Sequence, residues 1–294
     1  MEDRFSRFHP AITFIFYIGA VVFAMVFYHP AYLIAAAAGS AAFLLTVRGR
    51  RAFKLMAGLA VIFVVIMAVN PFVNTLGPTV LFRPFGRPYT LEALRYGAAV
   101  AAILVSVIMW FASYNEGMTS DKFVYLFGRF APSVTLILTM VLRFIPNYIK
   151  KARQIEGARL GIGRGYGSGN KERMNHAANN LSALMSWALE GGVITADSMK
   201  SRGYGSGKRT AFSTYRFGFG DKVLLGVLAA LAAGVIGCSL SGGTAVSYAP
   251  EYLPCSLKDP ACLSGLVLYS VFVFIPTVIN VTEAVKWRIL RSGI

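Results

Sequence analysis

Long apolar runs recur through this sequence, and six of them are long enough to cross a lipid bilayer as helices, which takes about 20 residues. They cover residues 11–28, 31–47, 53–69, 96–112, 223–240 and 263–281. Of the 294 residues, 56% are hydrophobic and only 14% are charged, against about 25% charged in ordinary soluble domains. This composition excludes a water-soluble globular enzyme and a disordered chain. We therefore expect an all-α polytopic membrane protein with about six membrane-spanning helices.

The basic residues indicate which helix ends face the cytoplasm. The chain has 29 Lys and Arg against 13 Asp and Glu, a formal net charge of +16. Cytoplasmic loops collect Lys and Arg, and the loop 48–54 contains Arg48, Arg50, Arg51 and Lys54. Because the first run is too long for a signal peptide and no cleavage site follows it, we expect an uncleaved first span. Six crossings then place both termini in the cytoplasm.

Two segments outside these runs have a different character. Residues 70–95 contain four prolines and are predicted to form an ordered turn region on the outer side. The apolar stretch 132–142 is closed by Arg143 and Pro146 and covers only about half of the ~30 Å hydrocarbon core. It is predicted to be a half-inserted helix rather than a seventh span. The sequence thus divides into residues 1–112 with four spans, 113–146 with short helices, 147–222, and 223–294 with the last two spans.

Residues 147–222 form a basic region in which no span is possible. It holds thirteen basic residues against five acids, which is more than an orientation signal needs. We expect a basic helix over 145–160 and a long amphipathic helix over 171–201. Apolar residues of the second helix recur every three or four positions and form one stripe, which needs a partner: Met174, Ala177, Leu181, Leu184 and Ala188.

A six-residue sequence, Arg-Gly-Tyr-Gly-Ser-Gly, occurs twice, at 164–169 and at 202–207. Each copy follows a predicted helix. Glycine after the last turn is a common helix stop, and a cation there is favoured by the helix dipole. Each copy taken alone is explained as an ordinary helix cap. The identical sequence of the two copies instead suggests two equivalent arginines that project from helix tips toward equivalent partner sites.

Several kinds of chemistry are disfavoured by the residues present. Gly207-Lys208 is followed by Arg209 instead of Ser or Thr, so it is no phosphate-binding loop. His9, His29 and His176 have no ligand at metal-site spacing, which argues against a metal ion, and we expect His176 on a solvated helix face. The spans hold almost no acids, although ion-coupled carriers usually keep ionisable groups there. We expect no cofactor and no enzymatic activity.

Four segments resemble the transmembrane coupling component, or T component, of energy-coupling factor (ECF) type transporters of the ABC class. They are Asn-Pro-Phe-Val-Asn at 70–74, Met-Thr-Ser-Asp-Lys-Phe at 118–123, Leu-Arg-Phe-Ile-Pro at 142–146 and Ala-Asp-Ser-Met-Lys-Ser-Arg-Gly-Tyr-Gly at 196–205. The resemblance covers about residues 9–222, and the last segment is its most specific part.

The resemblance implies a non-catalytic scaffold in the plasma membrane of a bacterial cell. In this family two ABC ATPases lie under the T component, and a small membrane protein, the substrate-binding S component, packs against it. Two cytoplasmic coupling helices end in Ala-Arg-Gly, whose arginine docks into a groove of one ATPase. ATP-driven movement of these helices reorients the S component for uptake of a micronutrient, here most simply a vitamin.

The docking residues carry over unevenly. Ser201-Arg202-Gly203 stands where the family has Ala-Arg-Gly, so Arg202 is the predicted docking residue. At the first helix the family pattern falls on Gly161-Ile162-Gly163, with Ile162 in the arginine position. The internal repeat nominates Arg164, and Arg159 lies about one turn earlier, so the first docking residue is predicted to be one of these two.

Two further side chains are assigned supporting roles. Arg143 belongs to the Leu-Arg-Phe-Ile-Pro segment. Asp197 lies five residues before Arg202, and it is either a solvated acid or an ion-pair partner that orients the helix. An arginine suits a carboxylate-lined groove because its planar fork stays charged and offers five donors.

Alternatives remain open at the level of the sequence. A self-sufficient channel or carrier needs polar groups along a path through the spans, and the sequence offers few. A basic anchor for anionic lipid or nucleic acid would use residues 147–222, but we expect the bilayer and protein partners and no nucleic acid. The small residues Ala35, Ala36, Ala37, Ala38 and Gly39 suit close packing within the chain or a sliding surface for a partner. Cys255 and Cys262 share a loop and are predicted to be free thiols, although an oxidising exterior would allow a bridge.

Overall fold

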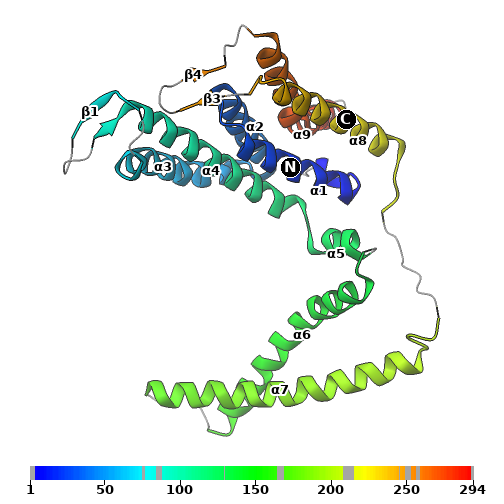
Figure 1. Ribbon diagram of the computed structural model, residues 1–294. Coiled ribbons are helices and arrows are strands. Elements are labelled where there is room, and N and C mark those ends of the chain that lie inside the picture. The colour runs from blue at the N-terminus through cyan, green and yellow to red at the C-terminus, as the bar shows by residue number, and fades with distance from the viewer. Residues whose placement is uncertain are drawn as a thin grey trace. The chain divides into compact units, whose positions relative to one another are not determined.

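Helices make up most of the structure, a computed structural model that describes residues 4–74, 77–83, 88–128, 130–163, 169–207, 215–244, 246–248, 253–255 and 259–292 (Figure 1). A short 3-10 helix, Phe5–Arg7, precedes the first α-helix. The α-helices are α1 (Pro10–Val26), α2 (Pro30–Arg48), α3 (Arg50–Val73), α4 (Leu91–Gly117), α5 (Ser120–Gly128), α6 (Pro132–Gly161), α7 (Asn170–Ser201), α8 (Phe219–Leu240) and α9 (Pro260–Ser292). The chain therefore has the all-α, polytopic membrane architecture that its apolar runs predict.

Two small antiparallel hairpins interrupt the helices. Strand β1 (Val80–Phe82) pairs with β2 (Tyr89–Thr90), with Val80 opposite Thr90 and Phe82 opposite Tyr89. Strand β3 (Val246–Ser247) pairs with β4 (Leu253–Pro254). The first hairpin lies inside the segment predicted as an ordered turn region. Helix α3 also runs further than expected, since Pro71 lies within its last turn.

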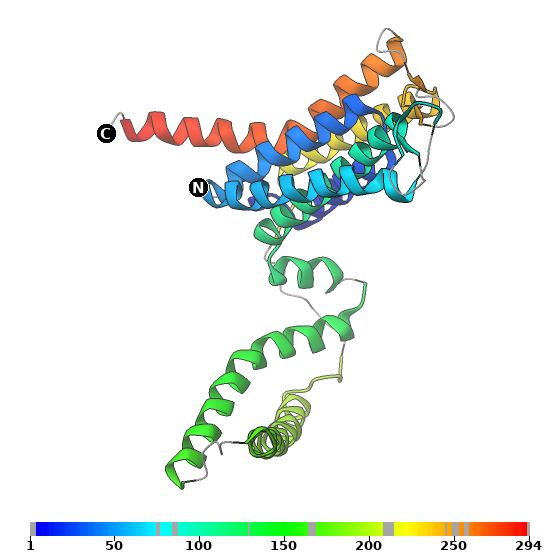
Figure 2. The same cartoon turned by 90° about the vertical axis from the view of Figure 1, so that its left-hand side faces the viewer.

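The chain divides into two units, which are described separately. One consists of Met1–Phe123 with Tyr215–Ile294, and the other of Val124–Thr214. The first unit contains α1 to α4, α8 and α9, which pack as a bundle (Figure 2). The second contains α6 and α7. The boundary between the two units falls within α5.

Among the described residues, six helices are long and apolar enough to cross a membrane: α2, α3, α4, α6, α8 and α9. This number agrees with the sequence prediction, but the membership differs. Helix α1, predicted as the first span, is 17 residues long and shorter than these six. Helix α6 is long enough because it does not stop where the sequence suggested.

The break expected at Pro146 is absent from α6. The sequence predicted a short apolar helix over 132–142 and a separate basic helix over 145–160, but both belong to one helix of 30 residues with Pro146 inside it. Proline costs an interior helix one hydrogen bond and crowds the preceding turn, yet it can kink a helix without ending it. In α6 the turns on both sides of Pro146 stay helical.

The core of the first unit is aromatic and joins helices that are distant in sequence. Trp110 of α4 is fully buried, with its ring centroid 5.5 Å from that of Phe16 and 6.1 Å from that of Tyr17, both on α1. The ring of Phe5 packs edge-on against Phe16 at 5.1 Å. Since aromatic rings bury large areas and favour such edge-to-face contacts, α1 is an integral part of the bundle despite its length.

The first two helices begin with the same dipeptide, His-Pro. Proline is favoured in the first turn because its missing N–H group is not needed there. The preceding histidine caps the helix: His9 Nδ1 accepts a hydrogen bond from Ala11 N at 3.3 Å, and His29 Nδ1 accepts one from Ala31 N at 3.3 Å. Neither histidine had been predicted as a helix cap.

Some of the small residues of α2 pack against other helices of the same chain. Ala36 and Gly39 are buried, and any side chain at Gly39 would collide with Val273 of α9. Ala38, on another side of the helix, is exposed. Close packing between the chain's own helices thus accounts for Ala36 and Gly39, as is usual for small residues between membrane helices.

Candidate functional site

Two long helices make up most of the second unit, and they pack against each other. Helix α6 has 30 residues and α7 has 32, so they are about 45 and 48 Å long at 1.5 Å per residue. The Trp187 ring of α7 lies edge-on to Tyr148 of α6, with the ring centroids 5.7 Å apart, and Lys151 Nζ lies 5.3 Å from the centroid of the Trp187 ring. This cation–π contact ties the basic face of α6 to α7.

Helix α7 ends in a complete glycine stop. Gly203 has φ of +80°, its N–H donates to Lys200 O at 3.0 Å, and Tyr204 N–H donates to Met199 O at 3.0 Å. This pair of hydrogen bonds is the Schellman motif, which satisfies the last carbonyls of a helix and reverses the chain. The predicted helix stop at Gly203 is therefore present.

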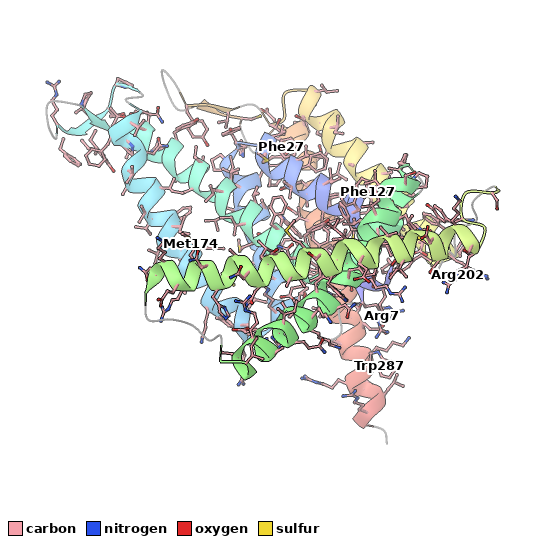
Figure 3. The ribbon with its side chains drawn as sticks, turned by 90° about the horizontal axis from the view of Figure 1, so that it is seen from below. Arg7, Phe27, Phe127, Met174, Arg202 and Trp287 are labelled. Carbon is pink, nitrogen blue, oxygen red and sulfur yellow. The ribbon has the colours of Figure 1, made fainter. Side chains whose placement is uncertain are left out.

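Arg202 occupies the last position before the reversal. Its N–H still donates to Ser198 O at 3.2 Å, and Ser201 Oγ donates to Asp197 O at 2.9 Å. The side chains of Ser201 and Arg202 are exposed at the tip of α7, at the opposite end of the helix from Met174 (Figure 3). Among the described residues, Arg202 forms no ion pair. A rigid helix thus presents an uncommitted guanidinium group to solvent.

The end of α6 repeats this geometry with a different side chain. Gly163 has φ of +75° and its N–H donates to Leu160 O at 3.0 Å, as Gly203 does to Lys200. Ile162 therefore stands in the position of Arg202, and its side chain is 71% exposed. The structural match agrees with the family pattern, which places Ile162 at the first arginine.

The two copies of Arg-Gly-Tyr-Gly-Ser-Gly are consequently not equivalent with respect to their helices. Arg202 immediately precedes the left-handed Gly203, whereas Arg164 follows the left-handed Gly163. Arg164 itself lies outside the described residues. Arg159, the other candidate, is half-buried in the last turn of α6, and its Nε atom is buried with no hydrogen-bond partner among the described residues.

The two supporting residues lie apart from the tip. Asp197 is exposed, and the described residues include no ion pair between it and Arg202; its backbone carbonyl accepts the Ser201 hydroxyl. Residues five apart on a helix point in different directions, because 3.6 residues complete one turn. Arg143 is exposed in the first half of α6, sixteen residues before Arg159.

The prediction that His176 lies on a solvated face is wrong. His176 is only 5% exposed on α7, and Asn180 Nδ2 lies 3.4 Å from its Nδ1 atom. The partly buried residues of α7, which include His176, Asn180, Leu184 and Trp187, recur every three or four positions. The three-to-four-residue period alone cannot say which face of a helix is covered, so the sequence did not reveal that His176 is buried.

The apolar stripe of α7 is mostly left uncovered. Met174 is 70% exposed and Leu181 57% exposed, and the neighbouring Met185 and Leu189 are exposed as well. Only Leu184 and Ala188 of the predicted stripe are half-buried. Exposed apolar surface of this extent on one helix marks an interaction surface.

Asp221, which the sequence reasoning missed, anchors the chain where it re-enters the first unit. Its Oδ2 atom accepts from Gly218 N at 2.9 Å at the start of α8, and its Oδ1 atom accepts from His9 N at 3.2 Å at the start of α1. The His9 ring stacks on Phe217 with centroids 3.7 Å apart. An acid in the first turn after a glycine was the available signal, since it satisfies free N–H groups there.

Comparison with known proteins gives two similar sequences. The chain is 28% identical over 145 residues to "Energy-coupling factor transporter transmembrane protein EcfT 1" of Listeria monocytogenes serotype 1/2a, an alignment that covers 47% of this chain and 54% of that protein. It is 25% identical over 203 residues to "Energy-coupling factor transporter transmembrane protein EcfT" of Bacillus selenitireducens, which covers 65% of this chain and 75% of that protein. No family model matches the chain. The resemblance inferred from the four motifs is confirmed by these two similarities.

Proposed function

We propose that the chain is the transmembrane T component of an ECF-type ABC importer, a non-catalytic scaffold that couples ATP hydrolysis in two partner ATPases to movement of a substrate-binding S component. The observation that carries the proposal is the tip of α7. A 32-residue helix ends in Ser201-Arg202-Gly203, the arginine is exposed, and Gly203 turns the chain away so that the guanidinium is accessible. A stiff helix with a charged fork at its end can transmit a push from a partner that holds the fork.

The first docking position differs from the second. Arg159 or Arg164 is proposed to serve there, because Ile162 supplies no charge at the position that matches Arg202. An apolar Ile162 beside a displaced arginine suits a partner groove that differs from the one that receives Arg202. The two ATPases would then be non-identical.

The distribution of charge in the first unit supports a cytoplasmic position for the termini. Arg4 pairs with Glu283, and Arg48 pairs with Glu116 at 2.9 Å, so the start of the chain, the α2–α3 loop, the end of α4 and the last part of α9 lie at one end of the bundle. The cations Arg50, Arg51 and Lys54, which belong to the start of α3 and not to a loop as the sequence suggested, are at this end, and both hairpins connect helices at the other. By the positive-inside rule the cationic end faces the cytoplasm.

The distribution of buried and charged residues also indicates which helices cross the membrane. Helix α1 packs in the aromatic core of the bundle, so we propose that it crosses the membrane with α2, α3, α4, α8 and α9. Helix α6 has no buried residue, and its second half contains Lys150, Lys151 and Arg153. Charged side chains are costly within the hydrocarbon core, so α6 is proposed to enter the membrane at most with residues 132–142.

The exposed stripe of α7 is proposed as a contact for the S component. Met side chains are flexible and suit a surface that accommodates more than one partner. Met174 and Met185 lie on this stripe together with Leu181 and Leu189. The cargo is proposed to be a micronutrient, most simply a vitamin, which the S component rather than this chain would bind.

Replacement of Arg202 tests the docking role. Purification of the Arg202→Glu protein from its native membrane should recover ATPase subunits at least about tenfold less than the unmodified chain, since loss of one partner from a hydrogen-bonded charge pair costs 2–5 kcal/mol or more. Arg173→Glu is the matched control, because Arg173 is also exposed on α7 but lies in its first turn. Quantitative mass spectrometry of the co-purified proteins gives the measurement.

Undiminished ATPase recovery and normal uptake with Arg202→Glu would contradict the proposed docking. Transport by the chain reconstituted alone would instead favour a self-sufficient channel or carrier. If Arg202→Glu and Arg173→Glu weaken association equally, the basic region acts through its total charge and not through one docked arginine.

A further inference from the structure

An apolar groove of about 680 Å³ lies between α8 and α9 in the first unit. The described residues that line it are apolar, among them Phe8, Phe219, Val223, Val227, Val271 and Val278. Several of these are widely exposed, for example Phe219 at 84% and Val278 at 55%. The groove opens on the side of helices that are apolar enough to span the bilayer, so its natural surroundings are lipid chains.

The walls favour a flexible chain over another helix as the occupant. Membrane helices approach one another through small residues, and α8 and α9 do so elsewhere along their length. A side chain at Gly234 of α8 would lie 2.9 Å from Leu268 of α9, and one at Gly265 of α9 would lie 3.0 Å from Cys238 Cβ of α8. Apart from Gly220, the described residues that line the groove have large aromatic or branched side chains, and none of these side chains offers a polar group for a hydrogen bond between helices.

Cations stand at only one end of the groove. Lys222 is exposed next to Val223 at the start of α8, and Lys286 is exposed two turns after Ile279 on α9. From Val223 to the end of α8, and from Pro260 to Thr282 of α9, there is no charged residue. Trp287 is 54% exposed beside Lys286 (Figure 3), and Trp is typical of the membrane–water interface. The cationic end is therefore at headgroup level.

We propose that this groove is a binding site for an anionic phospholipid, with one acyl chain between α8 and α9 and the phosphate held by Lys222 and Lys286. Lysine near an anionic membrane surface contributes about 1 kcal/mol, which corresponds to about fivefold in affinity per residue. An acyl chain in the groove covers apolar surface that other lipids would otherwise contact, and the chain of that one lipid becomes ordered. The lipid would brace the pair α8–α9 beside the point where Asp221 anchors the start of α1.

Photo-crosslinking of the full-length chain in nanodiscs tests the site. The probe is phosphatidylglycerol with a diazirine on one acyl chain, and the matched phosphatidylcholine probe has the same chain. We expect phosphatidylglycerol to label peptides that contain residues 219–227 and 271–279 at least fivefold more than phosphatidylcholine does. Equal labelling by both lipids, or phosphatidylglycerol labelling no stronger there than along α3, would overturn the proposal.

Two pairs of variants separate the groove from the general lipid surface. Gly220 lines the groove and has open space where a side chain would begin, so Gly220→Leu fills the groove without a clash and should reduce this labelling several-fold. Gly226→Leu is the control, since Gly226 is on the same helix with equally open space but does not line the groove. Lys222→Gln with Lys286→Gln should abolish the preference for phosphatidylglycerol, whereas Lys54→Gln on α3 should leave it unchanged.

If the groove holds a segment of a partner membrane protein instead, labelling at 219–227 and 271–279 will be weak in the native complex and will rise when the partner is removed. That result would reject the lipid as the natural occupant. The test reads lipid binding directly, so it does not depend on ATPase docking at Arg202.

Discussion

Single residues at the tip of α7 show how a backbone requirement exposes a charged side chain. Gly203 adopts φ of +80°, which an L-residue with a side chain reaches at a cost of about 1–2 kcal/mol. This conformation lets the chain leave immediately after Arg202 and so exposes the guanidinium. Arg202 and Gly203 therefore act together, one as the charged group and the other as the condition for its exposure.

Gly203→Ala should loosen the end of α7 without unfolding the protein. Strain of about 1–2 kcal/mol at residue 203 weakens the hydrogen bonds that the backbone N–H groups of residues 203 and 204 donate. These two amides should therefore exchange with solvent about tenfold faster or more. Hydrogen exchange followed by mass spectrometry measures this. Gly207→Ala is the control because Gly207 lacks a positive φ, and equal exchange rates in both variants would show that the Schellman motif is not formed.

His9 makes the stability of the first unit dependent on pH. It is 6% exposed, and burial lowers the pKa of His9 below its ordinary value of 6.5, although the nearby Asp221 carboxylate opposes this shift. Below pH 6.5 the unfolded chain takes up a proton that the folded chain resists, so the free energy of unfolding falls as the pH falls. Neutral His9 also leaves Nδ1 able to accept the N–H of Ala11.

The pH effect can be measured by thermal unfolding in detergent at pH 7.5 and pH 5.5. From pH 7.5 to pH 5.5 the melting temperature of the unmodified chain should fall by more than that of His9→Asn, because Asn keeps a cap acceptor but has no titrating ring. His29 and His176 are present in both proteins and so cancel in the comparison. The same pH dependence in the two proteins would show that His9 does not titrate as its burial indicates.

At the scale of elements, α6 is the helix that departs most from the sequence prediction. Arg143 and Pro146 are common signs of a helix end, yet the helix continues through both. Its length is what allows Arg159 and Ile162 to stand at a tip far from the apolar residues 132–142. One continuous helix is stiffer along its axis than two short helices joined at Pro146 would be.

Pro146→Ala tests this continuity. If α6 is one helix, the variant gains a hydrogen bond to Leu142 O and loses a steric clash, which together favour the helix by up to about 3 kcal/mol. The melting temperature in detergent should rise, whereas Pro132→Ala at the first position of α6 should change it little because proline is tolerated there. A lower melting temperature for Pro146→Ala would indicate that the chain needs a break at this point.

At the scale of the whole molecule, contacts between distant segments hold the membrane unit together. Asp221 bonds to His9 across 212 positions, Phe5 N donates to Asn280 Oδ1 at 3.0 Å across 275, and Arg4 pairs with Glu283. All three tie the start of the chain to α8 or α9. The N-terminal segment therefore closes the bundle at the cationic end.

Asp221→Ala should destabilise the unit by about 1–2 kcal/mol, because two N–H groups at helix starts lose their acceptor. Asp221→Asn should cost about half as much, since the amide keeps one acceptor oxygen where the carboxylate uses two. Asp197→Ala is the control, because its carboxylate accepts no hydrogen bond among the described residues. Denaturation in detergent gives the order of the free energies of unfolding. Equal stability of Asp221→Ala and the unmodified chain would contradict the proposed anchor.

The reactivity of the cysteines near the β3–β4 hairpin also depends on tertiary contacts. None of Cys238, Cys255 and Cys262 forms a disulfide in the structure. Burial and the neighbouring Asp259, whose Oδ2 atom lies 3.5 Å from Cys255 Sγ, raise the pKa of Cys255 to about 11. A thiol with a raised pKa is a poor nucleophile at neutral pH, so sharing a loop with Cys262 does not by itself make Cys255 reactive.

The membrane class, most of the apolar helices and the stop at Gly203 could be predicted from the sequence, because the signals for them act within a few residues: hydropathy over one span, and a glycine after the last turn. Tertiary structure decided which faces are covered and which ends meet. His176 is buried because α6 packs against α7, and Asp221 reaches His9 because α1 and α8 are neighbours in the bundle. Local patterns carry no information on such pairings, since the free energy that selects them comes from contacts between residues on different helices.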